Sequence, residues 1–370
     1  MRLLAAVAGA LLLGFVLLDA FETIILPRRV TRRLRLTRLF YRTTWPPFAA
    51  VARVVPAGHK ETYLSFYGPL SLVMLLILWA SALVLAFGLL QFADGTPAQL
   101  PNGRYSNSIA TNIYLSGSTL FTLGLGDVAP RGRVARVLAV VEAGTGFGFL
   151  AVVIGYFPVI YQAFSRRELN ISLLDARAGS PPTAAELLRR HQGPGGLDAL
   201  ERLLHEWEQW SADLLESHLS YPVLAYFRSQ HKNESWLTAL TTVLDTSALL
   251  MLGISGPCAR QARLTFAIAR HALVDLAQVF GTPPKPGEDR LPPAVLAALH
   301  ADLAALSLPL AEKAETRLAE LRSLYEPYAA ALSRYLRHGL PPWRVESPLR
   351  DNWQTTAWDR APAPAEEEHF

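Results

Sequence analysis

The chain has 370 residues, of which 51% are hydrophobic, and a formal net charge of +4 at pH 7. Its single cysteine, Cys258, excludes an internal disulfide and cannot begin a zinc knuckle. The apolar residues gather in three stretches within the first 165 positions, which is typical of membrane spans and not of one large soluble core. We therefore expect an all-α membrane protein with a separate, less apolar second half.

The first stretch, Leu3 to Leu26, is broken only by Asp19 and Glu22 and predicts an N-terminal transmembrane helix within residues 1–27. A signal peptide is the alternative, but the letters LDAF near the end of the run do not resemble an Ala-x-Ala-like cleavage site. Asp19 and Glu22 share one helical face, so they either pair with the following arginines at the membrane interface or line a protein contact. We expect the interfacial pairing.

Residues 28–66 are predicted to be an Arg-rich interfacial helix and linker. Arginines recur there at every third position, at Arg29, Arg32, Arg35 and Arg38. This spacing resembles a voltage sensor, but apolar pairs do not separate the arginines and only one helix precedes them. We expect an amphipathic helix along the inner leaflet, bound to anionic lipid headgroups. The positive charge of this loop predicts that it is cytoplasmic.

A pore domain is predicted over residues 67–165. Its outer helix covers 67–92 and its inner helix 134–164, because both runs are long and apolar. Between them, a helix over 108–120 is too short to span and leads into a Gly-rich turn. Irregular backbone at membrane depth is tolerated where it lines a water-filled cavity, so this order of elements indicates a pore.

The Gly-rich turn resembles the selectivity filter of the potassium-channel pore family, which reads T-V-G-Y-G-D. The residues that match are Thr122, Leu123, Gly124, Leu125, Gly126 and Asp127. The resemblance implies that K⁺ is bound by backbone carbonyls from four chains, here at Thr122, Leu123, Gly124 and Leu125. Gly124 and Gly126 allow the positive φ that points successive carbonyls at one axis.

Two upstream residues are predicted to support this filter. Tyr114 stands where many family members have Trp, and the resemblance implies a hydrogen bond from it to Asp127. Thr119 is the second supporting residue. Leu123 replaces the usual Val and Leu125 the usual Tyr, so the side-chain hydroxyl that braces the family's filter is missing here.

The inner helix carries candidate gating residues. Gly146 lies close to the family's hinge glycine, whereas Gly144 and Gly148 form a small-xxx-small pattern that favours helix packing without a hinge. Both readings stay open. Pro158 should kink the helix, and Phe157 beside it would form a hydrophobic constriction.

Residues 166–340 are predicted to be an all-α cytoplasmic domain, followed by a flexible tail over 341–370. The expected helices are Thr183–His191, Leu197–Leu219, Glu234–Leu252, Ala259–Phe280, Ala294–Leu306 and Glu312–Arg337. The apolar run from Trp236 to Gly253 could be a fourth span, but central Asp245 favours a helix buried in protein.

A metal or hydrolase site in this domain is a weaker alternative, because its candidate residues match no ligand spacing. Those residues are His218, His231, His271, His300, Asp213 and Asp245.

Together these features predict a homotetrameric, potassium-selective channel of the cell membrane. A single pore loop requires four subunits to close the ring. We expect K⁺ to be the permeant ion and expect no other cofactor, enzymatic activity or nucleic-acid partner. We also expect a lipid or cytoplasmic signal to gate the pore at the inner helices. The alternatives are a non-selective cation channel, or a membrane-anchored helical signalling or scaffold protein whose pore does not conduct.

Overall fold

The computed structural model describes residues 1–26, 34–101, 103–230, 234–308, 314–345 and 351–354. The chain is an all-α membrane protein, and it divides into two compact units, Met1–Tyr161 and Gln162–Phe370. Four of the described helical segments are long and apolar enough to cross a membrane: Arg2–Ile25, Ala57–Asp94, Arg133–Ala178 and Trp236–Gly253.

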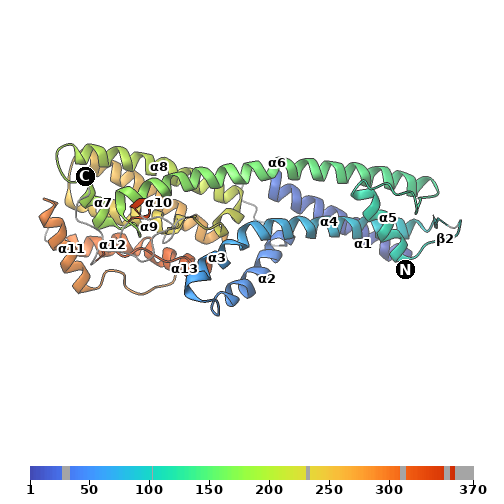
Figure 1. Cartoon of the computed structure of the whole chain (residues 1–370), viewed down its shortest axis with the longest axis horizontal. Helices are drawn as coiled ribbons and strands as arrows, with labels where there is room; N and C mark the ends of the chain where they lie inside the picture. Colours follow the sequence, from blue (N-terminus) through green and yellow to red (C-terminus); the bar gives the residue numbers. More distant parts are fainter. Residues whose placement is uncertain (27–33, 102, 231–233, 309–313, 346–350, 355–370) are drawn as a thin grey trace. The chain divides into compact units, whose positions relative to one another are not determined.

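The first unit is built on two long helices that lie side by side, α1 (Arg2–Ala20) and α4 (Tyr67–Asp94) (Figure 1). A five-residue π-helical turn, Phe21–Ile25, continues α1. The two helices approach closely at Gly9, where an added Cβ would lie 2.8 Å from the Ala86 carbonyl oxygen. Small residues permit such contact between membrane helices.

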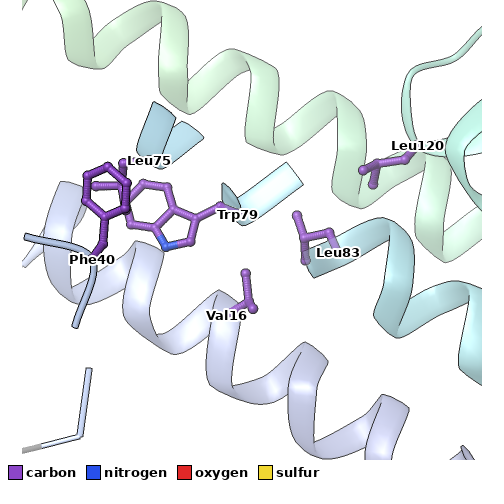
Figure 2. Packing of buried hydrophobic residues seen from close by; sticks show 6 residues of the cluster. All are labelled: Val16, Phe40, Leu75, Trp79, Leu83 and Leu120. Atoms are coloured by element: carbon purple, nitrogen blue, oxygen red, sulfur yellow. The ribbon is translucent and has the colours of Figure 1, made fainter. Parts of the chain in front are cut away.

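An apolar cluster joins four helices of this unit (Figure 2). It consists of Val16 of α1, Phe40 of α2, Leu75, Trp79 and Leu83 of α4, and Leu120 of α5. Val16, Trp79 and Leu83 are each no more than 1% exposed. The N-terminal helix is therefore part of the packed core of the unit.

Helices α2 (Leu36–Val51) and α3 (Ala57–Ser65) lie between α1 and α4 in the sequence. The arginine segment differs from the prediction, because α2 begins only at Leu36 and Arg35 is extended, with φ −135° and ψ 135°. Arg29 and Arg32 lie outside the described residues. Helix α2 is anchored by Trp45, whose ring meets that of Tyr67 edge-on at 4.7 Å.

The loop after α4 contains a two-stranded antiparallel sheet, β1 (Ala98–Gln99) with β2 (Tyr105–Ser106). It leads to the short helix α5 (Ile109–Leu120) and the long helix α6 (Arg133–Ala178). Helix α6 continues fourteen residues beyond the predicted end at 164. Apolar residues at helical spacing, Ile171, Leu174 and Ala178, are buried there and explain the extension.

The second unit is a helical bundle around α9 (Trp236–Gly253). Its other helices are α7 (Ala184–Arg190), α8 (Gly196–Ser220), η2 (Pro222–Tyr226), α10 (Pro257–Val279), α11 (Pro293–Ala305), α12 (Ala314–Ser323), α13 (Glu326–Leu336) and η3 (Asn352–Gln354). In its most apolar window, 83% of the α9 residues are buried within the protein, against 11% for α6. This burial supports the interpretation of α9 as a helix inside protein.

Two details of the second unit differ from the prediction. The single helix expected over Glu312–Arg337 is divided at Leu324 and Tyr325 into α12 and α13, because Pro327 lies in the first turn of α13 and favours a new start. The tail is docked where it is described: the Trp343 side chain is fully buried, and Arg344 Nε donates to Asp302 Oδ2 at 2.8 Å.

Candidate functional site

Helix α5 places the Gly-rich turn and is tied to α4. It begins at the cap residue Ser108, whose hydroxyl accepts the backbone N–H of Thr111 at 3.1 Å. Its twelve residues rise only about 18 Å, too little to cross about 30 Å of hydrocarbon. Gly88 of α4 lets α5 approach, because a Cβ there would lie 3.1 Å from the Ile113 Cα.

In the segment after α5, the backbone angle φ is positive at every second residue. Thr122, Gly124 and Gly126 have φ of +55°, +58° and +73°. Such values are uncommon for a residue with a β-branched side chain, so the strain at Thr122 marks an imposed conformation. A strand that turns to the left-handed region at alternate residues can direct successive carbonyls to one side.

Hydrogen bonds hold both ends of this segment. At its start, Thr122 N donates to Thr119 O at 3.0 Å and Leu123 N donates to Ser118 O at 2.8 Å. At its end, the Tyr114 hydroxyl donates to Asp127 Oδ2 at 2.7 Å. The bond expected between Tyr114 and Asp127 is thus present, and α5 braces the segment from both ends.

Comparison with known proteins bears on this geometry. Residues 72–162 match a family model described as "Ion channel", and this span contains most of α4, all of α5, the Gly-rich turn and much of α6. These residues form an ion-channel pore domain.

A relative from Bacillus subtilis, described as "Uncharacterized membrane protein YdjJ", is 22% identical over 198 residues. The match covers 54% of this chain and 57% of the relative, so it spans less than two thirds of the relative's length. No solved structure matches the chain.

The side chains of the Gly-rich turn are exposed in the single chain. Leu123 and Leu125 are 60% and 62% exposed, and apart from its chain neighbours no described residue lies within 4 Å of a Cβ built on Gly124 or on Gly126. Thr119 supports the pore through its main-chain carbonyl, whereas its hydroxyl donates to Leu115 O within α5 at 2.8 Å. The carbonyl oxygens offered by this segment are hard ligands that suit an alkali cation.

Gly144, Gly146 and Gly148 of the inner helix differ in their surroundings. An added Cβ at Gly146 would overlap the carbonyl of Leu120, the last residue of α5, whereas no described residue outside the local helix backbone lies within 4 Å of a Cβ at Gly144 or Gly148. Gly146 is therefore a close-packing site within the chain. A bend at Gly146 and a constriction at Phe157 and Pro158 stay predictions; α6 passes through Pro158 without ending.

Arg35 was predicted to bind lipid headgroups, but in the structure its side chain is directed to two acidic residues of the same unit. Its Nε lies 3.7 Å from Asp19 Oδ1 and 3.5 Å from Glu22 Oε2, and its side chain is 17% exposed. Asp19 is fully buried and also accepts the indole N–H of Trp79 at 3.0 Å. The sequence left two alternatives open for Asp19 and Glu22, pairing with an arginine or lining a protein contact. The structure shows both, because Arg35 pairs with these carboxylates inside a buried contact. Arg38 is exposed, and its lipid contact stays a prediction.

One pore contact has no counterpart in the sequence-based predictions. Glu142 of α6 is fully buried and is hydrogen-bonded to the Ser116 hydroxyl of α5, which also lies 2.8 Å from Val84 O of α4. A carboxyl group amid an apolar run was the only signal, because the sequence does not show which helix face meets the pore helix.

The candidate metal residues of the second unit do not converge. Within the described part of the chain, no group of three or more His, Cys, Asp or Glu is arranged to hold a metal. Burial and then Arg167 lower the pKa of His218, so this imidazole is neutral. His271 lies beside Asp275 and His300 beside Glu315, whereas His231 lies outside the described residues.

Asp245 has a structural partner instead. Arg290 binds its two carboxylate oxygens with two N–H groups, each at 2.8 Å, and the Tyr325 hydroxyl donates to Oδ1 at 2.5 Å. Arg290 comes from the loop between α10 and α11 and also bonds Glu326 and the Pro341 carbonyl. This bidentate pair joins α9, that loop and the chain after α13 in the core of the second unit.

Proposed function

We propose that the protein is a homotetrameric, potassium-selective channel whose filter is Thr122 to Asp127. The observation that carries the proposal is the alternation of positive φ at Thr122, Gly124 and Gly126 between two anchored ends. Four copies of such a segment around one axis would replace the water shell of K⁺ with carbonyl oxygens. Asp127 would place negative charge at the mouth and raise the local cation concentration.

Apolar side chains that are exposed in the single chain support the assembly of several copies. Large apolar side chains of α6 are open, including Val140, Phe147 and Ile154, each at least 63% exposed. A membrane helix can leave such residues to lipid, but the open backbone of the filter needs protein or water around it. A fourfold ring meets that need and closes by symmetry.

The proposal also covers the orientation of the chain in the membrane and the signal that gates the pore. The positive charge of the loop after α1 supports a cytoplasmic location for that loop and for the second unit. Arg29, Arg32 and the exposed Arg38 would contact anionic lipids, and the helical unit would bind the cytoplasmic ligand or partner that biases α6.

Ion flux into liposomes tests conduction. We expect the purified protein to carry K⁺. We expect Gly124→Asp to abolish the flux, because a residue with a Cβ is strained at the backbone angle φ +58° that Gly124 has at the proposed axis. Gly103→Asp is the matched control, since Gly103 has φ +73° and open space around it but lies in the loop before α5. Flux that survives Gly124→Asp and equals that of the control would refute the proposal.

Leu125 gives a specific reason to examine a second candidate, a non-selective cation channel. Leu lacks the hydroxyl through which the family's Tyr braces its filter, and the Leu125 side chain is 62% exposed in the chain. Equal flux of Na⁺ and K⁺ would favour this candidate, whereas flux of neither ion would favour a signalling or scaffold protein.

A further inference from the structure

A hydrogen-bonded chain of three oxygens joins the three helices of the pore domain behind the filter. It runs from Glu142 Oε1 of α6 to the Ser116 hydroxyl of α5 and on to Val84 O of α4, the second distance being 2.8 Å. Ser116 and Glu142 are both fully buried. The number of protons available to these three oxygens therefore decides which group donates in each contact.

The Ser116 hydroxyl carries one proton, and a main-chain carbonyl can only accept. If Ser116 donates to Glu142, its contact with Val84 O brings together two oxygens with no proton between them. If Ser116 donates to Val84 O, the proton between Ser116 and Glu142 must belong to Glu142. Only the second assignment places one proton in each of the two contacts.

The surroundings of Glu142 agree with this assignment. Its Oε2 is buried and has no hydrogen-bond partner among the described residues, and no described arginine or lysine is paired with it. A buried carboxylate without a cation and with one donor at most is very costly, whereas the neutral acid leaves only one weak acceptor unmet. Burial thus favours the form that the proton count requires.

The contact lies where it can act on the filter. Ser118 and Thr119, two and three residues after Ser116, accept the backbone N–H groups of Leu123 and Thr122. One turn beyond Glu142, Gly146 packs against the carbonyl of Leu120, so α6 holds the second half of α5 at two adjacent points of one face. A shift of α6 at these points would move the backbone that starts the filter.

We propose that Glu142 is a protonated, hydrogen-bond-donating residue that positions the pore helix through Ser116 and so sets the filter geometry. The proposal deepens the proposed function and rests on it for its effect on conduction. The state of the Glu142 proton, however, can be measured whether or not the protein conducts.

Infrared spectroscopy of the full-length protein in liposomes tests the proton first. At neutral pH, the spectrum of the wild type minus that of Glu142→Gln should contain the carbonyl stretch of a protonated carboxylic acid. Glu234→Gln is the control, because it removes another acid, partly buried in the other unit, whose pKa is raised by burial, and it should leave the Glu142 signal in place. A carboxylate signal in the difference spectrum would overturn the proposal.

Ion flux then tests the positioning role. Glu142→Gln keeps an N–H donor for Ser116 and should change K⁺ flux and the K⁺/Na⁺ flux ratio by less than about twofold. Glu142→Ala and Ser116→Ala each remove the contact and should change one of these quantities by about threefold or more. The double variant should change it no further than the larger single effect.

The outcomes separate the two proposals. Additive effects of the alanine variants, or a Gln variant that behaves like the Ala variant, would overturn the role of Glu142 while leaving the channel intact. A wild type that conducts no ion would refute the proposed function, and the infrared result alone would then decide the state of Glu142. Folding is checked through Glu142→Gln, which preserves shape and contact.

Discussion

The Trp79 indole N–H donates to Asp19 Oδ2 at 3.0 Å, which joins the N-terminal helix to the outer helix of the pore domain through a buried carboxylate. The same oxygen accepts the backbone N–H and the hydroxyl of Thr37, at 3.0 and 2.6 Å. Three segments, α1, the start of α2, and α4, thus meet at one carboxyl group. With Arg35 beside it, this group ties the extra helix to the pore domain.

The Trp79 bond is expected to contribute measurably to stability. Trp79→Phe keeps most of the ring packing and removes the donor, and we expect a loss of about 1.5–3 kcal/mol in the free energy of unfolding, the usual range for hydrogen bonds to charged groups. Denaturation of the purified protein in detergent measures it. In a double-mutant cycle with Asp19→Asn, the two losses should be non-additive; full additivity would show that the bond contributes nothing.

Gly146 should tolerate no side chain. Gly146→Ala places a Cβ against the Leu120 carbonyl, and we expect about 1–3 kcal/mol of destabilisation from overpacking, together with altered conduction. Gly144→Ala is the matched control, because the same helix has open space within the chain at that position. Thermal denaturation of both variants checks the expectation. Equal stability of the two variants would contradict close packing at Gly146.

Breaking the buried ion pair of the second unit should be costly. Arg290→Met leaves Asp245, which is fully buried, without its cation, and we expect a loss of about 3–5 kcal/mol. The tryptophan fluorescence of the unit during chemical denaturation reports it. The double variant Asp245→Leu with Arg290→Met removes both charges, so it should lose less than Arg290→Met alone. A double variant that is less stable than Arg290→Met would contradict this account.

The stability of the second unit should depend on pH through Glu234. Burial, and then the charge of Asp175, raises the pKa of Glu234 from 4.5 to about 8. Between these values the folded state binds a proton that the unfolded state lacks, so this group's contribution to the free energy of unfolding falls as the pH rises. Denaturation at a series of pH values measures the slope, and Glu234→Gln should reduce it. An unchanged slope in the variant would place the titration elsewhere.

The sequence predicted the pore elements because their signals are local. Length and hydropathy identify α1, α4 and α6, and the T-x-G-x-G-D letters identify the Gly-rich turn without knowledge of packing. The same holds for the helices of the second unit, where predicted and observed bounds mostly agree within one or two residues. Each of these features depends on residues close together in the chain.

The remaining features depend on contacts between distant residues. Asp245 and Arg290 are 45 positions apart, and Asp19 and Trp79 are 60 apart, so no periodic pattern shows these pairs. The docking of Trp343 was missed because a Pro-rich composition suggests a loose tail, whereas its ring fills a buried site beneath the guanidinium groups of Arg290 and Arg322. Positive φ at Thr122 was missed because a β-branched residue rarely adopts it.

The reversal potential in asymmetric K⁺ and Na⁺ tests the central claim most directly. Purified protein in planar bilayers, with K⁺ on one side and Na⁺ on the other, should give a current that reverses close to the potassium equilibrium potential if the segment from Thr122 to Asp127 selects K⁺ as we propose. A reversal potential near zero under these conditions would contradict a potassium-selective filter.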